Sequence, residues 1–371
     1  MKSLKTSSLF RLAALLLIAV IAICMVGFVA DGWQSEPQKQ PESGETDKNS
    51  GSTDENTDGG GGTVETPAPQ TPPEYTHYLT GLEISAEEKR QSPLCFVMDS
   101  ASPLYGISDT PFMVEIPIED GNSRFLVYQD QSKNLGKVGS MTKGRECILR
   151  LLDFFGGIAI QNGLDSTYAN LSGVTAKRPI FDLSTHSGYA YTENTNYLYT
   201  NKDLLLAGLQ NAGISITASE ANALPFRFND YFSDPIYYTT AAQTVTIPYN
   251  ETNETGLYYD SISGQYKLGK NGQTKNDLLN GKSVSFKNAF VLFANTTTYE
   301  SIEHTETIVD TAGGGQGYYF TEGSVCPIEW QLDPTGNLIF KNENGEMLTV
   351  NRGTSYLAFY KASRINDIIF A

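Results

Sequence analysis

The sequence predicts an α+β protein in which a mixed α/β domain is followed by a mainly β domain, with one transmembrane helix and a disordered linker in front. Three observations lead to this prediction. Residues 12–30 are uniformly apolar, residues 31–75 are polar and acidic, and the rest of the chain alternates short apolar runs with turn residues. The 21 tyrosines and 18 phenylalanines favour strands in the folded part.

The apolar run carries no charge and, as a helix, would be ~28 Å long, close to the thickness of a bilayer core. Basic residues precede it (Lys2, Lys5, Arg11) and Asp31 follows it, which predicts the N-terminus inside and the body outside the membrane. We therefore predict residues 1–30 to be an anchor or signal, most simply an uncleaved anchor.

Two alternatives to the uncleaved anchor remain open. Cys24 could carry a lipid, although Ile23 stands where a lipoprotein signal has a small residue. Cleavage after Ala30 is the other, with a poor match to the usual small residues at the cut. All three place the body in the same extracytoplasmic compartment.

Residues 31–75 hold ten acidic residues against two lysines and a glycine- and proline-rich end, which is typical of a disordered linker. The whole chain has a net charge of −16. A chain this acidic repels phosphate backbones, so we expect no nucleic acid as a partner.

Residues 76–224 are predicted to form the mixed α/β domain because strand-like and helix-like segments alternate. A helix is expected from a capping Ser140 to Phe155, and a second over residues 201–211. The expected strands are Leu94–Met98, Phe112–Ile118, Arg124–Gln129 and Gly157–Gln161.

Residues 225–371 are predicted to form the mainly β domain because their short apolar runs are separated by hairpin turns such as Ser263-Gly264 and Asn344-Gly345. The tyrosine pairs 237–238, 258–259 and 318–319 could form a sugar-stacking face; the alternative is that each pair places one ring in the core. The expected strands are Val284–Phe286, Phe290–Phe293, Tyr318–Phe320, Ile328–Leu332, Leu338–Phe340 and Tyr356–Tyr360.

The cysteines and histidines do not have the spacing of metal ligands. Cys95, Cys147 and Cys326 are predicted to be buried free thiols, with a Cys95–Cys147 bridge as the alternative. The three histidines stand singly in polar surroundings, which favours surface positions. We therefore expect neither a metal nor a cofactor.

Ser140 and Lys143 match S-x-x-K, the motif of penicillin-binding serine enzymes. On a helix, the lysine amine could lie beside the serine hydroxyl and act as its base. The alternative interpretation is a helix-capping serine followed by a solvated lysine.

Charged residues also end or flank the predicted strands. Asp99, Glu115 and Asp130 could converge with Arg124 at one edge of a sheet, and Ser140 lies near them in the sequence. We predict these five residues to line a binding cleft. Alternatively, each of the three carboxylates (Asp99, Glu115, Asp130) only satisfies neighbouring backbone donors.

A series of short motifs follows in a characteristic order along about residues 78–359. The motifs are Tyr78-Leu79-Thr80-Gly81-Leu82, Phe96-Val97-Met98-Asp99, Val114-Glu115-Ile116, Ser123-Arg124-Phe125-Leu126, Gln129-Asp130, Leu135-Gly136 to Ser140, Asn196-Tyr197-Leu198-Tyr199-Thr200, Gly317-Tyr318-Tyr319-Phe320 and Trp330. With these motifs the chain resembles the YerB-like lipoproteins of Gram-positive bacteria, a domain of unknown function with an N-terminal and a C-terminal part. The resemblance implies an extracytoplasmic, membrane-attached protein without an assigned reaction, and we add Asn196 and Tyr199 to the candidate binding residues.

The chain departs from the family pattern at residues 136–142, where two arginines of the family are absent, and at Ile23, which interrupts the lipobox. Relatives do not have S-x-x-K at Ser140. We therefore predict a membrane-tethered extracytoplasmic module that binds an envelope ligand or protein without catalysing a reaction. An envelope hydrolase or acyltransferase that uses Ser140 and Lys143 is the alternative.

Overall fold

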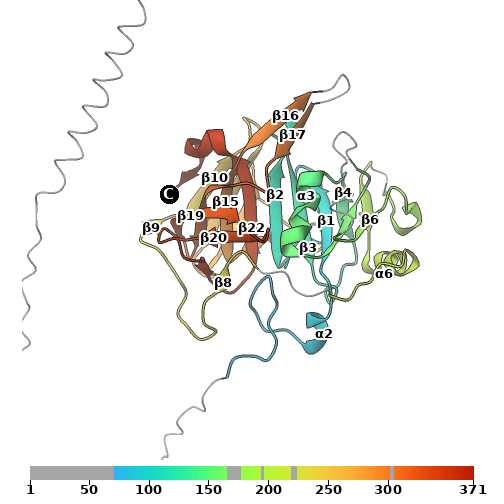
Figure 1. Cartoon of the computed structure of the whole chain (residues 1–371). Helices are drawn as coiled ribbons and strands as arrows, with labels where there is room; N and C mark the ends of the chain where they lie inside the picture. The colour runs from blue at the N-terminus through green and yellow to red at the C-terminus, as the bar shows by residue number, and fades with distance from the viewer. Residues whose placement is uncertain (1–70, 165–176, 194–195, 219–223, 301–304) are drawn as a thin grey trace, which may run out of the picture. The chain divides into compact units, whose positions relative to one another are not determined.

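The computed structural model of the chain describes residues 71–164, 177–193, 196–218, 224–300 and 305–371 (Figure 1). The predicted anchor, Cys24, most of the predicted linker and His304 lie outside these ranges. No helix within them combines the length and the apolar character that a membrane crossing requires. The chain divides into Met1–Ala68 and Pro69–Ala371, and all of the described residues belong to the second unit.

The described fold is predominantly β, as the tyrosine- and phenylalanine-rich sequence predicted, and its helices are fewer and shorter than a mixed α/β half requires. The helical segments are α2 (Ala86–Lys89), α3 (Glu146–Leu149), α4 (Leu151–Phe155), α6 (Lys202–Asn211), η1 (Glu119–Gly121), η3 (Ser187–Tyr189) and η4 (Ala362–Asp367). The strands of the first half are β1 (Leu94–Asp99), β2 (Phe112–Pro117), β3 (Ser123–Gln129), β4 (Val138–Met141), β5 (Ile158–Gln161), β6 (Ile180–Asp182) and β7 (Leu198–Thr200).

The described part of the second half contains strands only, apart from η4. They are β8 (Arg227–Phe228), β9 (Thr240–Ala241), β10 (Thr244–Pro248), β11 (Glu254–Asp260), β12 (Gln265–Lys270), β13 (Gln273–Thr274), β14 (Ser285–Phe286), β15 (Asn288–Ala294), β16 (Thr296–Glu300), β17 (Thr305–Val309), β18 (Gly314–Thr321), β19 (Ser324–Leu332), β20 (Leu338–Lys341), β21 (Thr349–Val350), β22 (Ser355–Lys361) and β23 (Ile369–Phe370). Each strand that the sequence predicted in this half is present, and the mainly β character of residues 225–371 is confirmed.

A 13-stranded sheet runs through the unit, with the main order β20-β19-β18-β15-β22-β2-β3-β1-β4-β7. Strand β22 lies between β15 and β2 and is parallel to both. Strands from both sides of residue 224 therefore pair directly, and the boundary there between two domains stays a prediction. A six-stranded sheet contains β10–β14 and β23.

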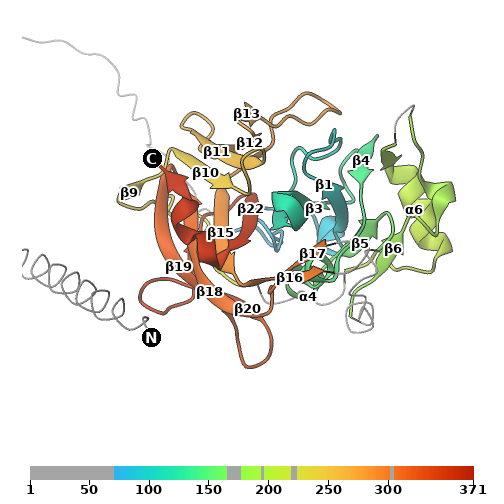
Figure 2. The same cartoon turned by 90° about the horizontal axis from the view of Figure 1, so that it is seen from above.

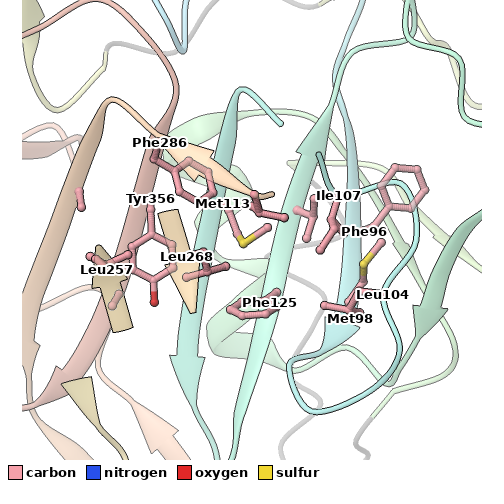
Figure 3. Close-up of a cluster of buried hydrophobic side chains, with 14 of the residues drawn as sticks. Phe96, Met98, Leu104, Ile107, Met113, Phe125, Leu257, Leu268, Phe286 and Tyr356 are labelled. Atoms are coloured by element: carbon pink, nitrogen blue, oxygen red, sulfur yellow. The ribbon is translucent and has the colours of Figure 1, made fainter. Parts of the chain in front are cut away.

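The two faces of the large sheet support two apolar cores. Figure 2 shows β10–β12 of the six-stranded sheet on one side of the large sheet and α4 on the other. Leu257, Leu268 and Phe286 of the six-stranded sheet lie in one core with Met113 and Phe125 of β2 and β3 (Figure 3). The helices α3 and α4 contribute to the core on the other face. Alternating residues of one strand point to opposite faces, so each central strand supplies both cores.

The predicted helix over residues 140–155 is correct only in its second part. Ser140 lies in strand β4, and the helical turns begin after Arg145. Gly139 exchanges backbone hydrogen bonds with Tyr105 at 2.6 and 3.2 Å, which fixes this segment as extended chain. The helix α6 matches the prediction, with the Asn201 side chain accepting from the Leu204 amide at its N-terminus.

Candidate functional site

Glu115 is fully buried and joins the two sheets. Its carboxylate accepts hydrogen bonds from the hydroxyls of Ser123 and Tyr356 on the large sheet. From the six-stranded sheet, the Thr255 hydroxyl donates a hydrogen bond to the carboxylate at 2.9 Å, and the Lys270 ammonium forms an ion pair with it at 2.7 Å. Both carboxylate oxygens are occupied by protein groups, which makes Glu115 a buried structural centre.

Arg124 lies on the opposite face of the sheet from Glu115. Its neighbour Ser123 points toward Glu115, and successive residues of a strand alternate between faces. The Arg124 guanidinium donates to the Lys143 carbonyl at 2.9 Å. Asp99 is directly opposite Arg124 in the strand register, and its carboxylate accepts from the Ala101 amide at 3.0 Å. The structure therefore does not bring Glu115 into one cleft with Asp99 and Arg124.

Asp130 lies beyond the other end of β3, about 20 Å along the strand from Arg124. It accepts from His77 Nε2 at 3.0 Å, while the Leu79 amide donates to His77 Nδ1 at 3.2 Å. This second bond requires Nδ1 to be the acceptor, so the proton is on Nε2. His77 is buried, which corrects the prediction of a surface histidine.

Ser140 is 1% exposed, and its hydroxyl donates to the Pro103 carbonyl at 3.3 Å. Because it lies in a strand, the helical i, i+3 geometry that the S-x-x-K interpretation needs is absent. The prediction of a helical Ser140–Lys143 pair is therefore wrong.

Tyr199 is buried and packs edge-on against Tyr105, with ring centroids 5.5 Å apart. The Lys137 ammonium lies 3.8 Å from the Tyr105 ring centroid and 4.0 Å from that of Tyr199. Asn196 is exposed. Tyr199 lies opposite Gly139, next to Ser140, where β7 pairs with β4. Whether any of the seven residues binds a ligand stays a prediction.

A better candidate site lies at the edge of the sheet where three parallel strands begin. Strand β5 is parallel to both β1 and β6, so the segments before all three strands meet at one edge. These segments bring Lys89 and Arg90, Gly156 and Gly157, and Arg178 to a cavity of about 430 Å³. Residues 76–78, directly after the predicted linker, supply a further wall.

The cavity combines an apolar body with positive charge. Tyr78, Ile84 and Pro93 supply apolar surface, and three basic side chains (Lys89, Arg90, Arg178) line it. The carboxylate of Glu88 also lines it but accepts from the Ser85 amide and hydroxyl at 2.8 and 2.9 Å. These hydrogen bonds lower the pKa of Glu88, and their capping geometry holds the carboxylate at the start of α2.

The floor of the cavity has no room for a side chain at Gly157. A Cβ there would lie 2.2 Å from Cys95 Sγ, and the backbone φ of +99° is itself unfavourable for other residues. Burial raises the pKa of the Cys95 thiol well above its usual value, so this sulfur is a packing group rather than a nucleophile. Tyr78 is fixed by its hydroxyl, which donates to the Phe155 carbonyl at 2.7 Å.

Cys95, Cys147 and Cys326 are all free and buried, so the predicted free thiols are confirmed and the Cys95–Cys147 bridge is absent. The described residues contain no group of three or more histidines, cysteines and carboxylates that could hold a metal ion. The cavity itself presents cations and apolar walls, a combination that suits a small amphipathic anion.

These basic residues were not among the candidates predicted from the sequence, although a signal was present. Lys89-Arg90 and Lys177-Arg178 each lie shortly before a strand, in a chain that is otherwise acidic. Two basic pairs before parallel strands must come to the same sheet edge. Only the strand pairing, which local sequence does not reveal, shows that β1 and β6 run in the same direction.

Comparison with known proteins agrees with the resemblance seen in the sequence. Residues 245–357 match the family described as the C-terminal domain of a protein of unknown function, DUF3048. The crystal structure of YerB protein from Bacillus subtilis is similar to 80% of this chain and 100% of that chain, with a TM-score of 0.68 and 19% sequence identity. No curated protein matches the chain. Residues 245–357 therefore match the DUF3048 C-terminal domain of unknown function, and the fold of the chain is similar to that of YerB.

Proposed function

We propose that this protein is a membrane-tethered, extracytoplasmic binding module that holds a small amphipathic anion in the cavity beside Arg178. The observation that carries the proposal is the meeting of Lys89, Arg90 and Arg178 around apolar walls at one sheet edge. A carboxylate, sulfonate or phosphate group would lie against the guanidinium, and an apolar body against Tyr78 and Pro93.

The tether supports the location part of this proposal. The charge asymmetry around residues 12–30 favours an external body, and the cavity wall begins at Thr76, directly after the linker. Proteolysis of intact cells tests the location. External protease is expected to remove the body without lysis, and protection until the cells are broken would contradict it.

Binding is tested with 8-anilinonaphthalene-1-sulfonate, a probe with an aromatic body and one sulfonate. Its fluorescence is titrated against the full chain and against Arg178→Gln, Arg178→Lys and Arg150→Gln. Arg150 is a matched control because it is a half-exposed arginine on a different cavity, paired with Glu146.

Removing the Arg178 charge is expected to weaken binding about tenfold, since a hydrogen bond to a charged group contributes about 1.5–3 kcal/mol and part of it is screened by solvent. Arg178→Lys is expected to keep part of the affinity, and raising the salt concentration to weaken binding of the wild type more than of Arg178→Gln. Equal affinities for Arg178→Gln, Arg150→Gln and the wild type, with near-UV circular dichroism unchanged, would contradict the proposal.

A further inference from the structure

Tyr237 is exposed in a way that its surroundings do not explain. It is 76% exposed and belongs to one of the tyrosine pairs noted in the sequence, whereas Tyr319 of another pair is fully buried. The segment that carries Tyr237 runs between β8 and β9, ahead of the short pairing of β9 with β19. An exposed ring on a mobile loop would lose conformational entropy on binding a ligand. Whether Tyr237 is suited to binding therefore depends on how firmly the backbone of this segment is held.

The backbone is held on both sides of Tyr237. On one side, the buried Asn351 side chain accepts from the Ile236 amide at 2.7 Å and donates to the Ile236 carbonyl at 2.8 Å. On the other, the Tyr238 amide donates to Ser324 Oγ at 2.9 Å, and the Tyr238 ring packs edge-on against Tyr319 with centroids 6.0 Å apart. Tyr237 is therefore presented to solvent by a fixed backbone, which lowers the entropic cost of using its ring for binding.

A surface hollow of about 580 Å³ lies beside this ring. Its lining includes Asp234, Thr239 and Glu322 together with both tyrosines. The Glu322 carboxylate is held in place by the Lys287 ammonium and by the Tyr259 hydroxyl, which donates to it at 2.8 Å. Burial and the Glu322 charge raise the pKa of Tyr259 to about 12, so this hydroxyl stays a donor at neutral pH.

We propose that this hollow binds a neutral oligosaccharide, with a pyranose ring stacked on Tyr237 and its hydroxyls donating to Asp234 and Glu322. An exposed aromatic face suits the apolar face of a sugar, and fixed carboxylates suit its hydroxyl groups. Among the described residues that line the hollow, none is basic, which disfavours an anionic ligand here. The site is thus chemically opposite to the cation-lined cavity and independent of it.

The test uses isothermal titration calorimetry of the full chain with two probes, the tetramers of β-1,4-linked glucose and of β-1,4-linked N-acetylglucosamine. These sugars have equatorial substituents and a flat apolar face. The variants are Tyr237→Ala, Tyr237→Trp and, as a matched control, Tyr299→Ala, which removes an exposed tyrosine from β16.

At least one tetramer is expected to bind, with affinity lost about tenfold or more in Tyr237→Ala. Affinity is expected to be kept in Tyr237→Trp, which retains a stacking face, and in Tyr299→Ala. Arg178→Gln is expected to leave the sugar affinity unchanged, which separates this proposal from the anion cavity. Absence of binding for both tetramers at millimolar concentration, or equal affinity for Tyr237→Ala and the wild type, would overturn it.

Discussion

Replacing Glu115 by alanine is expected to destabilise the protein strongly, because the carboxylate is the centre of the hydrogen-bonded contact between the two sheets. It is completely buried, and the Lys270 side chain that pairs with it is 10% exposed. Alanine removes the negative charge and leaves the ammonium in a site with little water. Thr255 and Tyr356 also lose their acceptor.

The cost follows from the burial of the pair. Breaking a buried ion pair by removing one partner costs about 3–5 kcal/mol, since the remaining charge is desolvated without compensation. Glu115→Gln keeps the shape and part of the hydrogen bonding, so a smaller loss is expected. In the double variant Glu115→Gln, Lys270→Met both charges are gone, and the loss is expected to be smaller than the sum of the two single losses by about 1–3 kcal/mol.

Unfolding in guanidinium, followed by circular dichroism, measures the free energies of unfolding of the wild type and the variants. The fluorescence of the buried Trp330 provides a second, independent signal of the same transition. Coincident transitions from both signals are required before free energies are compared. An alanine variant that loses less than about 1 kcal/mol, or single losses that simply add, would show that the pair does not hold the sheets together.

Two further predictions concern the cavity floor and the acid side of the stability curve. Gly157→Ala is expected to lower the free energy of unfolding by about 1–3 kcal/mol, and more than Gly156→Ala does, because only the alanine at position 157 places its Cβ against Cys95 Sγ. Thermal unfolding of both variants measures the difference. Equal losses of stability in the two variants would contradict this prediction. Burial opposes ionisation of Glu119, but hydrogen bonds from Arg145 and the backbone outweigh it and lower the pKa of the carboxyl. A carboxyl whose pKa is lower in the folded than in the unfolded protein adds stability above the usual carboxyl pKa, and this stability is lost as the pH falls through the folded-state pKa. Glu119→Gln removes this contribution, so the urea midpoint of the variant is expected to decline less steeply than that of the wild type below about pH 4. An unchanged slope would argue against the pairing of Glu119 with Arg145.

Local sequence patterns predicted strands such as β1–β3, β15 and β18–β20, because each of these is a run rich in apolar residues. They did not predict β10–β12 of the six-stranded sheet, and they placed β4 in a helix. The helix α6 was predicted from an equally local pattern. The position of β22 between β15 and β2 was beyond such patterns, since it pairs Ser355–Lys361 with Phe112–Pro117, segments far apart in the chain. The error at Ser140 has the same origin, because extended pairing with a distant strand outweighs a local capping preference.

The candidate site shows this limit more sharply. The sequence placed Glu115 among charged residues that end or flank predicted strands, but its partner Lys270 lies 155 residues away. A buried carboxylate requires a partner, and when that partner is supplied by the protein the group becomes structural. The sequence predicted Glu115 to line a binding cleft, and only the fold shows that it is buried and that Lys270, Thr255 and Tyr356 compensate its charge.

The acidity of the chain and the proposed binding of an anion in the cavity are compatible because charges act over different distances. At physiological ionic strength exposed charges are screened beyond about 8 Å, so distant carboxylates contribute little to the potential inside the cavity. A small anion responds to Lys89, Arg90 and Arg178 at short range. A polyanion covers a wide surface and experiences the net charge of −16. The same charge distribution therefore disfavours nucleic acid and permits a single anionic group, provided that the ligand is small enough to enter at the edge where β1, β5 and β6 begin.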